Sequence, residues 1–129
     1  MVIDTTPACP DLMNAAMAVA NLVVMPVRVE AAALKVLDRQ LDSFDLECEI
    51  VLVPNFVTPA SLLVWADLQS MASDIDAAIS PQLSYHQCLA VPSPVPIRYL
   101  PDPPPDVQAA REELLAIAGA LSMRLRKSD

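Results

Sequence analysis

His86 and Cys88 are the residues whose types and spacing most directly suggest chemistry. Two positions apart on a strand, their side chains would share one face. A cysteine beside a histidine can form an activated nucleophile or supply half of a metal site. This spacing rarely brings the imidazole nitrogen against the sulfur, and a metal site would also need Cys9 and Cys48 to converge on the pair. We therefore expect a half-buried cysteine beside a surface histidine, with no catalytic residue, no metal ligand and no cofactor.

Acidic residues form a second candidate group, at the junction between a predicted helix and the strand after it. Paired carboxylates can act in acid–base catalysis or bind a cation. This group lacks the order and the glycine of a calcium-binding loop, and its members diverge because they lie at a helix end and on a strand. We expect a solvated face rather than a site. The residues are Asp38, Asp42, Asp45, Glu47 and Glu49.

Glycine is almost absent from the chain. The one glycine, Gly119, lies within the predicted final helix, and thirteen prolines accompany it. Phosphate-binding loops, dinucleotide fingerprints and nucleophile elbows need glycine at tight turns, so none of them is present. Tight hairpin turns favour glycine as well, which argues against a hairpin-rich sandwich or barrel. The sequence therefore favours a protein that is not an enzyme.

The composition indicates one acidic domain, residues 1–129, with enough apolar residues (54%) for a core. A net charge of −8 opposes binding to nucleic acid or to anionic membranes, because phosphate groups are bound by Lys and Arg. The uncharged run Leu12–Val27 is too short to span a bilayer. Three widely spaced cysteines suit a reducing compartment. We expect a cytoplasmic protein with a protein partner, no nucleic-acid partner and no membrane partner.

The first predicted helix follows an irregular lead-in at residues 1–10. Asp11 is a suitable N-cap, and the helix would run to about Val24. Its residues are apolar on nearly every side. A helix of this kind is either deeply buried or faces a partner.

The segment Leu22–Val29 allows two interpretations. Its valines favour a strand that leads into a helix and forms part of a βαβ unit. Pro26 argues against a central strand, and it also prevents a continuous helix without a kink. We favour a helix that breaks at Pro26 and a second helix after it.

The middle of the chain carries the clearest elements. Glu30–Phe44 has apolar residues at helical spacing. Glu47–Val53 alternates at first and then becomes apolar on both sides, which predicts a strand whose later half is buried on both faces. Pro54 and Asn55 would end it. Thr58–Ile79 opens with a Thr-Pro start signal and predicts a helix with Trp65 as a core anchor.

Proline dominates the segment before the last helix. A short strand is predicted at His86–Val91, and residues 92–105 form a Pro-rich connector that docks on the domain. Residues 106–127 then form the C-terminal helix, for which Asp102 or Asp106 is the candidate cap.

These elements predict a helix-dominated α+β fold. Three to four amphipathic helices would pack around a minimal two- or three-stranded sheet. The sheet would be made from Glu47–Val53 and a strand within Leu89–Leu100.

The surplus of apolar helix surface predicts a non-enzymatic protein-binding or assembly protein, similar in composition to adaptor or chaperone-like accessory proteins. It would act as a homodimer through an apolar helix face. One alternative is a small-ligand-binding domain or enzyme with an apolar pocket near Tyr85, His86 and Cys88. Another is a structural component of a larger viral or secretion assembly. The predicted partner-binding residues are Leu12, Met13, Met17, Ala20 and Val24.

Overall fold

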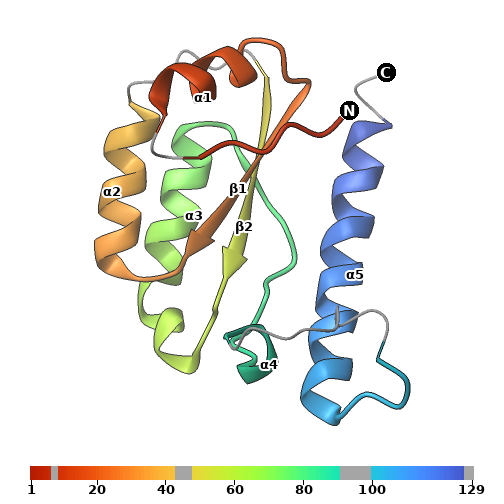
Figure 1. Ribbon diagram of the computed structural model, residues 1–129. Coiled ribbons are helices and arrows are strands. Elements are labelled where there is room, and N and C mark those ends of the chain that lie inside the picture. Colours follow the sequence, from red (N-terminus) through yellow and green to blue (C-terminus); the bar gives the residue numbers. More distant parts are fainter. Residues whose placement is uncertain (7–8, 43–47, 91–99, 127–129) are drawn as a thin grey trace.

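Three parallel strands in the order β1-β2-β3 form the sheet around which the helices pack (Figure 1). The structure is a computed structural model that describes residues 1–6, 9–42, 48–90 and 100–126. Helices predominate over the small sheet, which confirms the expected helix-dominated α+β class. The strands are β1 (Leu22–Arg28), β2 (Glu49–Asn55) and β3 (Ala78–Ile79), and the helices are α1 (Pro10–Met17), α2 (Ala31–Leu41), the 3₁₀ helix η1 (Pro59–Val64), α3 (Trp65–Asp74), α4 (Gln87–Ala90) and α5 (Pro105–Leu125).

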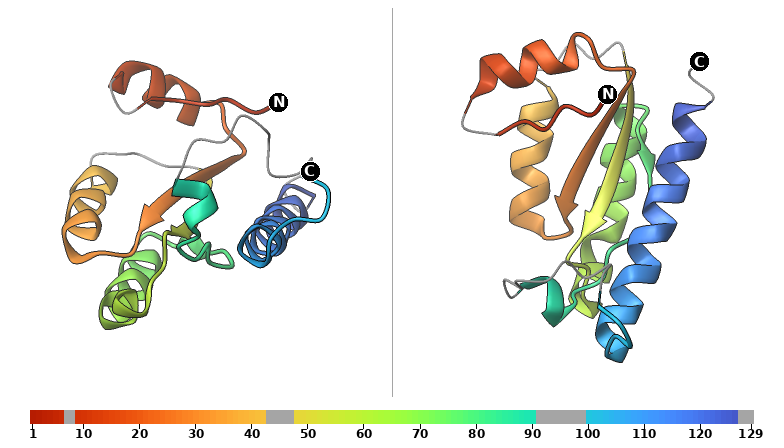
Figure 2. Two further views of the ribbon diagram at one scale, coloured as in Figure 1. Left: turned by 60° about the horizontal axis from the view of Figure 1, so that its bottom comes forward. Right: turned by 45° about the vertical axis from the view of Figure 1, so that its right-hand side comes forward.

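β2 is the central strand and is covered on both faces. α2 and α3 pack on one face of the sheet, and α5 lies on the opposite face (Figure 2). Ile50 and Leu52 point into the larger cluster with α2 and α3, whereas Val51 and Val53 meet Ile117 of α5. The buried run of β2 confirms the expected two-sided burial of its later half. Pro54 and Asn55, which were predicted to end the strand, are its last two residues, so β2 ends two residues later than Val53.

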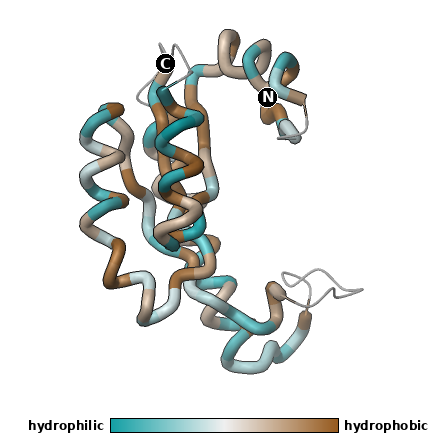
Figure 3. Tube along the Cα trace, turned by 90° about the vertical axis from the view of Figure 1, so that its left-hand side faces the viewer, coloured by the Kyte–Doolittle hydropathy of each residue, from teal (hydrophilic) through white to brown (hydrophobic). Residues whose placement is uncertain are grey.

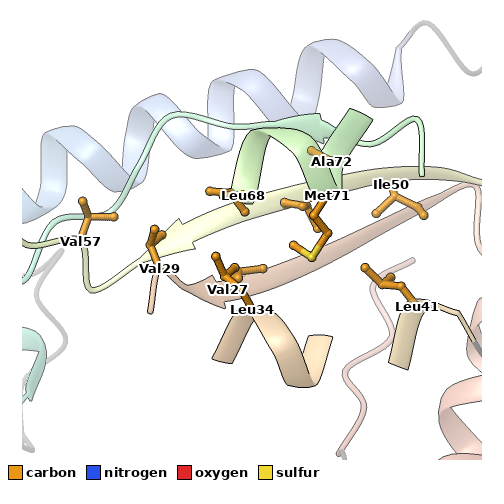
Figure 4. Packing of buried hydrophobic residues seen from close by; sticks show 10 residues of the cluster. Val27, Val29, Leu34, Leu41, Ile50, Val57, Leu68, Met71 and Ala72 are labelled. Atoms are coloured by element: carbon orange, nitrogen blue, oxygen red, sulfur yellow. The ribbon is translucent and has the colours of Figure 1, made fainter. Parts of the chain in front are cut away.

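The larger core cluster joins β1, β2, α2 and α3 (Figure 4). Trp65 packs against it from the first position of α3 and is partly buried, in line with its expected role as a core anchor. Because aliphatic residues fill the interior almost alone, shape rather than aromatic stacking holds the layers together. The buried members are Val27, Val29, Leu34, Leu41, Ile50, Leu52, Val57, Leu68, Met71 and Ala72.

Leu22–Arg28 is strand β1, so the favoured helix–break–helix interpretation is wrong and the strand interpretation is correct. β1 pairs in parallel with β2 along its whole length, from Leu22 beside Glu49 to Arg28 beside Asn55. With α2 between the two strands, this is the βαβ unit that the valines favoured.

The backbone direction along β2 explains why Pro26 removes no hydrogen bond between β1 and β2. The carbonyl oxygen of Leu52 accepts a hydrogen bond from the N–H of Ser80, on the β3 side. Backbone groups alternate along a strand, so odd-numbered residues of β2 face β1. Val24 is paired with Val51, and the odd-numbered residues of β1 therefore meet β2 while Pro26 directs its backbone to the outer edge. A proline there lacks only an N–H group that would have pointed away from the sheet.

Helix α1 is shorter than the sequence indicates. It begins at Pro10 with Cys9 at the N-cap, instead of Asp11, and it ends at Met17, well before Val24. Ala20 and Val24 are therefore not helical, and Val24 belongs to β1. The strand pairing of the valine-rich segment outweighs the helical continuation that its apolar character allowed.

Expectations for the segments that follow β2 in the chain also need correction. The predicted helix from Thr58 begins where expected, but its first turns are the 3₁₀ helix η1, and Ala78–Ile79 pairs with β2 as β3 instead of ending that helix. His86–Val91 is not a strand, because Gln87–Ala90 forms α4. The partner strand expected within Leu89–Leu100 falls mostly on residues 91–99, which lie outside the described residues, and the partners of β2 are β1 and β3.

Candidate functional site

His86 lies between two carboxylates of α5. Its Nδ1 is 2.9 Å from Oδ1 of Asp106, and its Nε2 is 3.0 Å from Oε2 of Glu113. The residue is only 7% exposed, so the prediction of a surface histidine is wrong. α4 lies beside the N-terminal half of α5 at this point (Figure 1). The contact ties the segment after β3 to the C-terminal helix.

Ser84 and Cys88 donate further hydrogen bonds to the two carboxylates. Ser84 donates its backbone N–H and its hydroxyl to the two oxygens of Glu113, at 2.6 and 2.8 Å. Cys88 donates its backbone N–H to Asp106 at 3.1 Å, and its thiol donates to the Asp106 backbone carbonyl at 3.9 Å. We call this group of five residues (Ser84, His86, Cys88, Asp106 and Glu113) the His86 clamp.

The clamp shifts the pKa values of its members in a consistent way. Burial opposes the charged imidazole, but the hydrogen bonds and charges of Asp106 and Glu113 outweigh burial and raise the pKa of His86. The hydrogen bonds from His86 and Cys88 lower the pKa of Asp106. Burial alone would raise the pKa of Glu113. The hydrogen bonds from Ser84 and the contact with His86 outweigh burial and lower that pKa. The favoured state is an imidazolium between two carboxylates.

The clamp does not form an activated cysteine. Both ring nitrogens of His86 are engaged by carboxylates, and the Cys88 sulfur faces the carbonyl of Asp106 instead of the imidazole. Burial and the neighbouring Asp106 raise the pKa of the Cys88 thiol, which keeps it protonated and weakly nucleophilic. No group of His, Cys, Asp and Glu suited to a metal ion occurs within the described residues.

Sequence reasoning missed the carboxylate partners of His86. Asp106 was expected as a helix cap, but the N-cap of α5 is Pro104 and Asp106 lies inside the helix. Asp106 and Glu113 are seven residues apart, which places them on one face of a helix about two turns apart. That spacing was the available signal. The sequence alone could not assign these two carboxylates to His86, because His86 reaches α5 only through the tertiary fold.

The acidic group expected to be a solvated face is partly accounted for. Asp38 and Asp42 are exposed on and just after α2, in agreement with that expectation. Glu49 instead forms an ion pair with Arg124 of α5. Asp45 and Glu47 lie outside the described residues.

A cleft of about 650 Å³ opens at the carboxyl ends of β1 and β2. It lies between the turn from β1 into α2 and the turn from β2 into η1, the edge where open parallel sheets commonly place their ligands. Val29, Ala31, Leu63 and Val64 supply apolar lining, and Tyr85 lies at the rim. We call it the carboxyl-edge cleft.

Phe56 forms the aromatic wall of this cleft in a backbone conformation unusual for its type. Its φ angle is 53°, in the left-handed region that bulky residues rarely adopt. The ring centroid lies 5.9 Å from that of Tyr85, at an interplanar angle of 48°, and also 5.9 Å from the guanidinium carbon of Arg28. Both spacings fall within the usual range for aromatic and cation–π contacts. Side chains from three separate segments thus meet at one edge of the sheet.

The residues of the alternative pocket prediction separate in the structure. Tyr85 lines the carboxyl-edge cleft, whereas His86 and Cys88 belong to the His86 clamp and face α5. Neighbouring side chains of an extended segment point to opposite sides, and the segment before α4 therefore serves two different places. The prediction grouped Tyr85, His86 and Cys88 in one pocket, but of the three only Tyr85 lines the cleft.

The predicted partner-binding residues lie at the other end of the molecule. α1 projects at the end away from α4 (Figures 1 and 3), and none of its residues is buried. Leu12 is 48% exposed and Val24 is 40% exposed, whereas the other three are partly covered. We call the set Leu12, Met13, Met17, Ala20 and Val24, with the neighbouring exposed Val19, the α1 surface.

Comparison with protein-family models, with curated proteins and with solved structures gives no match for this chain. Within the described ranges, no helix has the length and the apolar composition that crossing a membrane requires.

Proposed function

We propose that this chain is a non-catalytic protein-binding protein that associates through the α1 surface, first with a second copy of itself. One observation carries the proposal: α1 buries none of its residues, although Leu12, Met13 and Met17 are apolar. The adaptor or chaperone-like role suggested by the composition would use the same surface for a larger client.

An eight-residue helix needs support from outside itself. Isolated helices shorter than about 12–15 residues are marginal in water, and no side chain forms a hydrogen bond at the N-cap of α1. Its contacts with the other described elements are few. Full burial of a Leu or Met side chain contributes about 1.5–3 kcal/mol. A partner that covered Leu12 and Met17 would therefore supply what α1 lacks within one chain.

Charge favours a second copy at this surface over any other part of the molecule. Two chains of net charge −8 repel each other. The segment Leu12–Val27 carries no charged residue, so two copies can approach here without placing like charges in contact. A symmetric dimer pairs the same patch on both subunits, which suits the uncharged run that follows Asp11 in α1.

The state of the ionisable groups also supports a binding role. The one histidine of the chain has both ring nitrogens on carboxylates, and the pKa of the Cys88 thiol is raised. These groups stabilise the attachment of α5 and leave no free acid–base pair in the His86 clamp.

Sedimentation velocity tests the proposal. The wild-type chain is expected to sediment as a dimer at micromolar concentration, and the double variant Leu12→Gln/Met17→Gln as a folded monomer. The matched control is Val36→Gln/Leu115→Gln, which replaces exposed apolar residues on α2 and α5 and should stay dimeric. A monomeric wild type, or equal dissociation of both double variants, would overturn the proposal. Circular dichroism checks that each variant is folded.

A further inference from the structure

The carboxyl-edge cleft has the size and position of a ligand site that the proposed association does not use. Its volume of about 650 Å³ falls in the range of small-molecule pockets. It lies at the carboxyl ends of β1 and β2, whereas α1 lies beyond their amino ends (Figure 1). A ligand there would leave the α1 surface free.

Phe56, on the aromatic side of the cleft, has a strained backbone conformation. A left-handed backbone at a residue as bulky as Phe56 is unfavourable and persists only where the surroundings fix it. The N–H of Phe56 bonds to the side chain of Asn55, which helps to hold the turn. Tyr85, a residue that is 53% exposed, extends the aromatic wall. Its hydroxyl forms no hydrogen bond within the part of the chain that the structure describes.

Among the described residues that line the cleft, Arg28 is the cation and Glu30 the anion, and the two form an ion pair. Arg28 places its guanidinium over Phe56, and it has more N–H donors than the one that its exposed ion pair with Glu30 uses. Exposed ion pairs contribute little, so Arg28 can exchange Glu30 for a ligand carboxylate. Ala31 begins α2 at the cleft, and no side chain caps this helix, so its first N–H groups add positive potential.

We infer that the carboxyl-edge cleft binds a small aromatic carboxylic acid. The ring of the ligand packs on Phe56 and Tyr85 and against the apolar side chains of Leu63 and Val64. The carboxylate pairs with Arg28, in a charge-assisted hydrogen bond of the kind that Arg forms with planar anions. The Tyr85 hydroxyl supplies a second donor at the rim.

Titration of ¹⁵N-labelled protein with 3-phenylpropionate tests this inference, with 3-phenylpropionamide and phenethylamine as matched ligands of different charge. The acid is expected to give saturable shifts confined to the amides of residues 28–31, 56–58, 60–64 and 85. The neutral amide should bind about tenfold more weakly, because it lacks the charge-assisted bond, and the amine more weakly still.

Two exposed-site variants separate the charge from the ring. Arg28→Gln should weaken binding of the acid about tenfold and leave binding of the neutral amide unchanged. Arg39→Gln, on the exposed side of α2, is the control and should bind as wild type. Tyr85→Leu should weaken both ligands. Absence of saturable shifts at millimolar acid, tighter binding of the amine, or wild-type affinity for the acid in Arg28→Gln would each overturn the inference.

Discussion

The His86 clamp and the α1 surface, at opposite ends of the fold, treat their side chains in opposite ways. In the clamp, each carboxylate and each imidazole nitrogen has a partner within the chain. Across the described residues, no buried side-chain nitrogen or oxygen lacks one. On α1, in contrast, apolar side chains remain uncovered and nothing is buried. The polar groups of the clamp hold elements of the chain together, whereas the uncovered side chains Leu12 and Val19 near the other end are apolar.

This difference bears on function more than either region does alone. A histidine, a cysteine and two acids in contact would ordinarily be examined as a catalytic group. Their hydrogen bonds join the segment before α4 to α5, whose Ile117 packs on Val51 and Val53. The uncovered apolar side chains of α1 are the basis of the proposed association.

Loss of Glu113 from the His86 clamp should cause the largest loss of stability. Glu113→Ala removes the acceptor of three hydrogen bonds and leaves His86 and Ser84 without it. We expect the free energy of unfolding to fall by about 2–4 kcal/mol. Urea denaturation followed by circular dichroism measures it. The control Glu112→Ala, whose exposed side chain bonds to Gln108, should change it by less than about 0.5 kcal/mol.

The pH dependence of stability should be the next largest effect. The pKa of His86 is raised above its ordinary 6.5, so its contribution is complete below about pH 6.5 and is lost as pH rises through the higher folded value. The pKa values of Asp106 and Glu113 are lowered from 3.8 and 4.5, so their contributions are complete above those values and are lost as pH falls through the lower folded values. Stability should therefore be greatest between about pH 4.5 and 6.5.

His86→Gln isolates the histidine part of this dependence, because the chain has one histidine. At pH 6 the variant should be less stable by about 1–2 kcal/mol. The gap to wild type should narrow as pH rises above 6.5, when the wild type loses the imidazolium. Urea melts at several pH values measure both quantities. A gap that stayed constant from pH 5.5 to about 8.5 would show that the charge of His86 does not stabilise the clamp.

The smallest effect is expected on the α1 side. Leu12→Ala should change the free energy of unfolding by less than about 0.5 kcal/mol at concentrations where the chain is monomeric, because Leu12 is not buried within one chain. The same substitution should weaken self-association. A loss of several kcal/mol in the monomer would show that α1 is part of the core and would remove the contrast with the clamp.

The elements that sequence reasoning predicted well are those whose evidence is local. The heptad-like spacing of leucines in α2 and the Thr58-Pro59 start of η1 act within a few residues, and the apolar run of β2 requires burial on both faces in any fold. β1 was misjudged because the cost of Pro26 depends on which neighbour its backbone faces. That direction follows only from the register with β2.

The candidate sites were harder to predict because each joins distant segments. His86 meets Asp106 and Glu113 across 20 and 27 residues, and nothing local in the sequence indicates that they meet. Phe56 and Tyr85 likewise meet only because Val57 bridges to Ser84 beside them. The partner-binding residues were chosen because an uncharged apolar run is visible in the sequence; their role stays a prediction, and Ala20 and Val24 were assigned to the wrong element.

Amide hydrogen exchange at two protein concentrations compares the α1 surface and the His86 clamp in one sample. The amides of Leu12–Met17 are expected to exchange rapidly at low concentration and to become protected where the chain associates. Amides of the clamp segment Ser84–Ala90 should show the same protection at both concentrations. Protection of α1 that does not change with concentration would contradict association through the α1 surface.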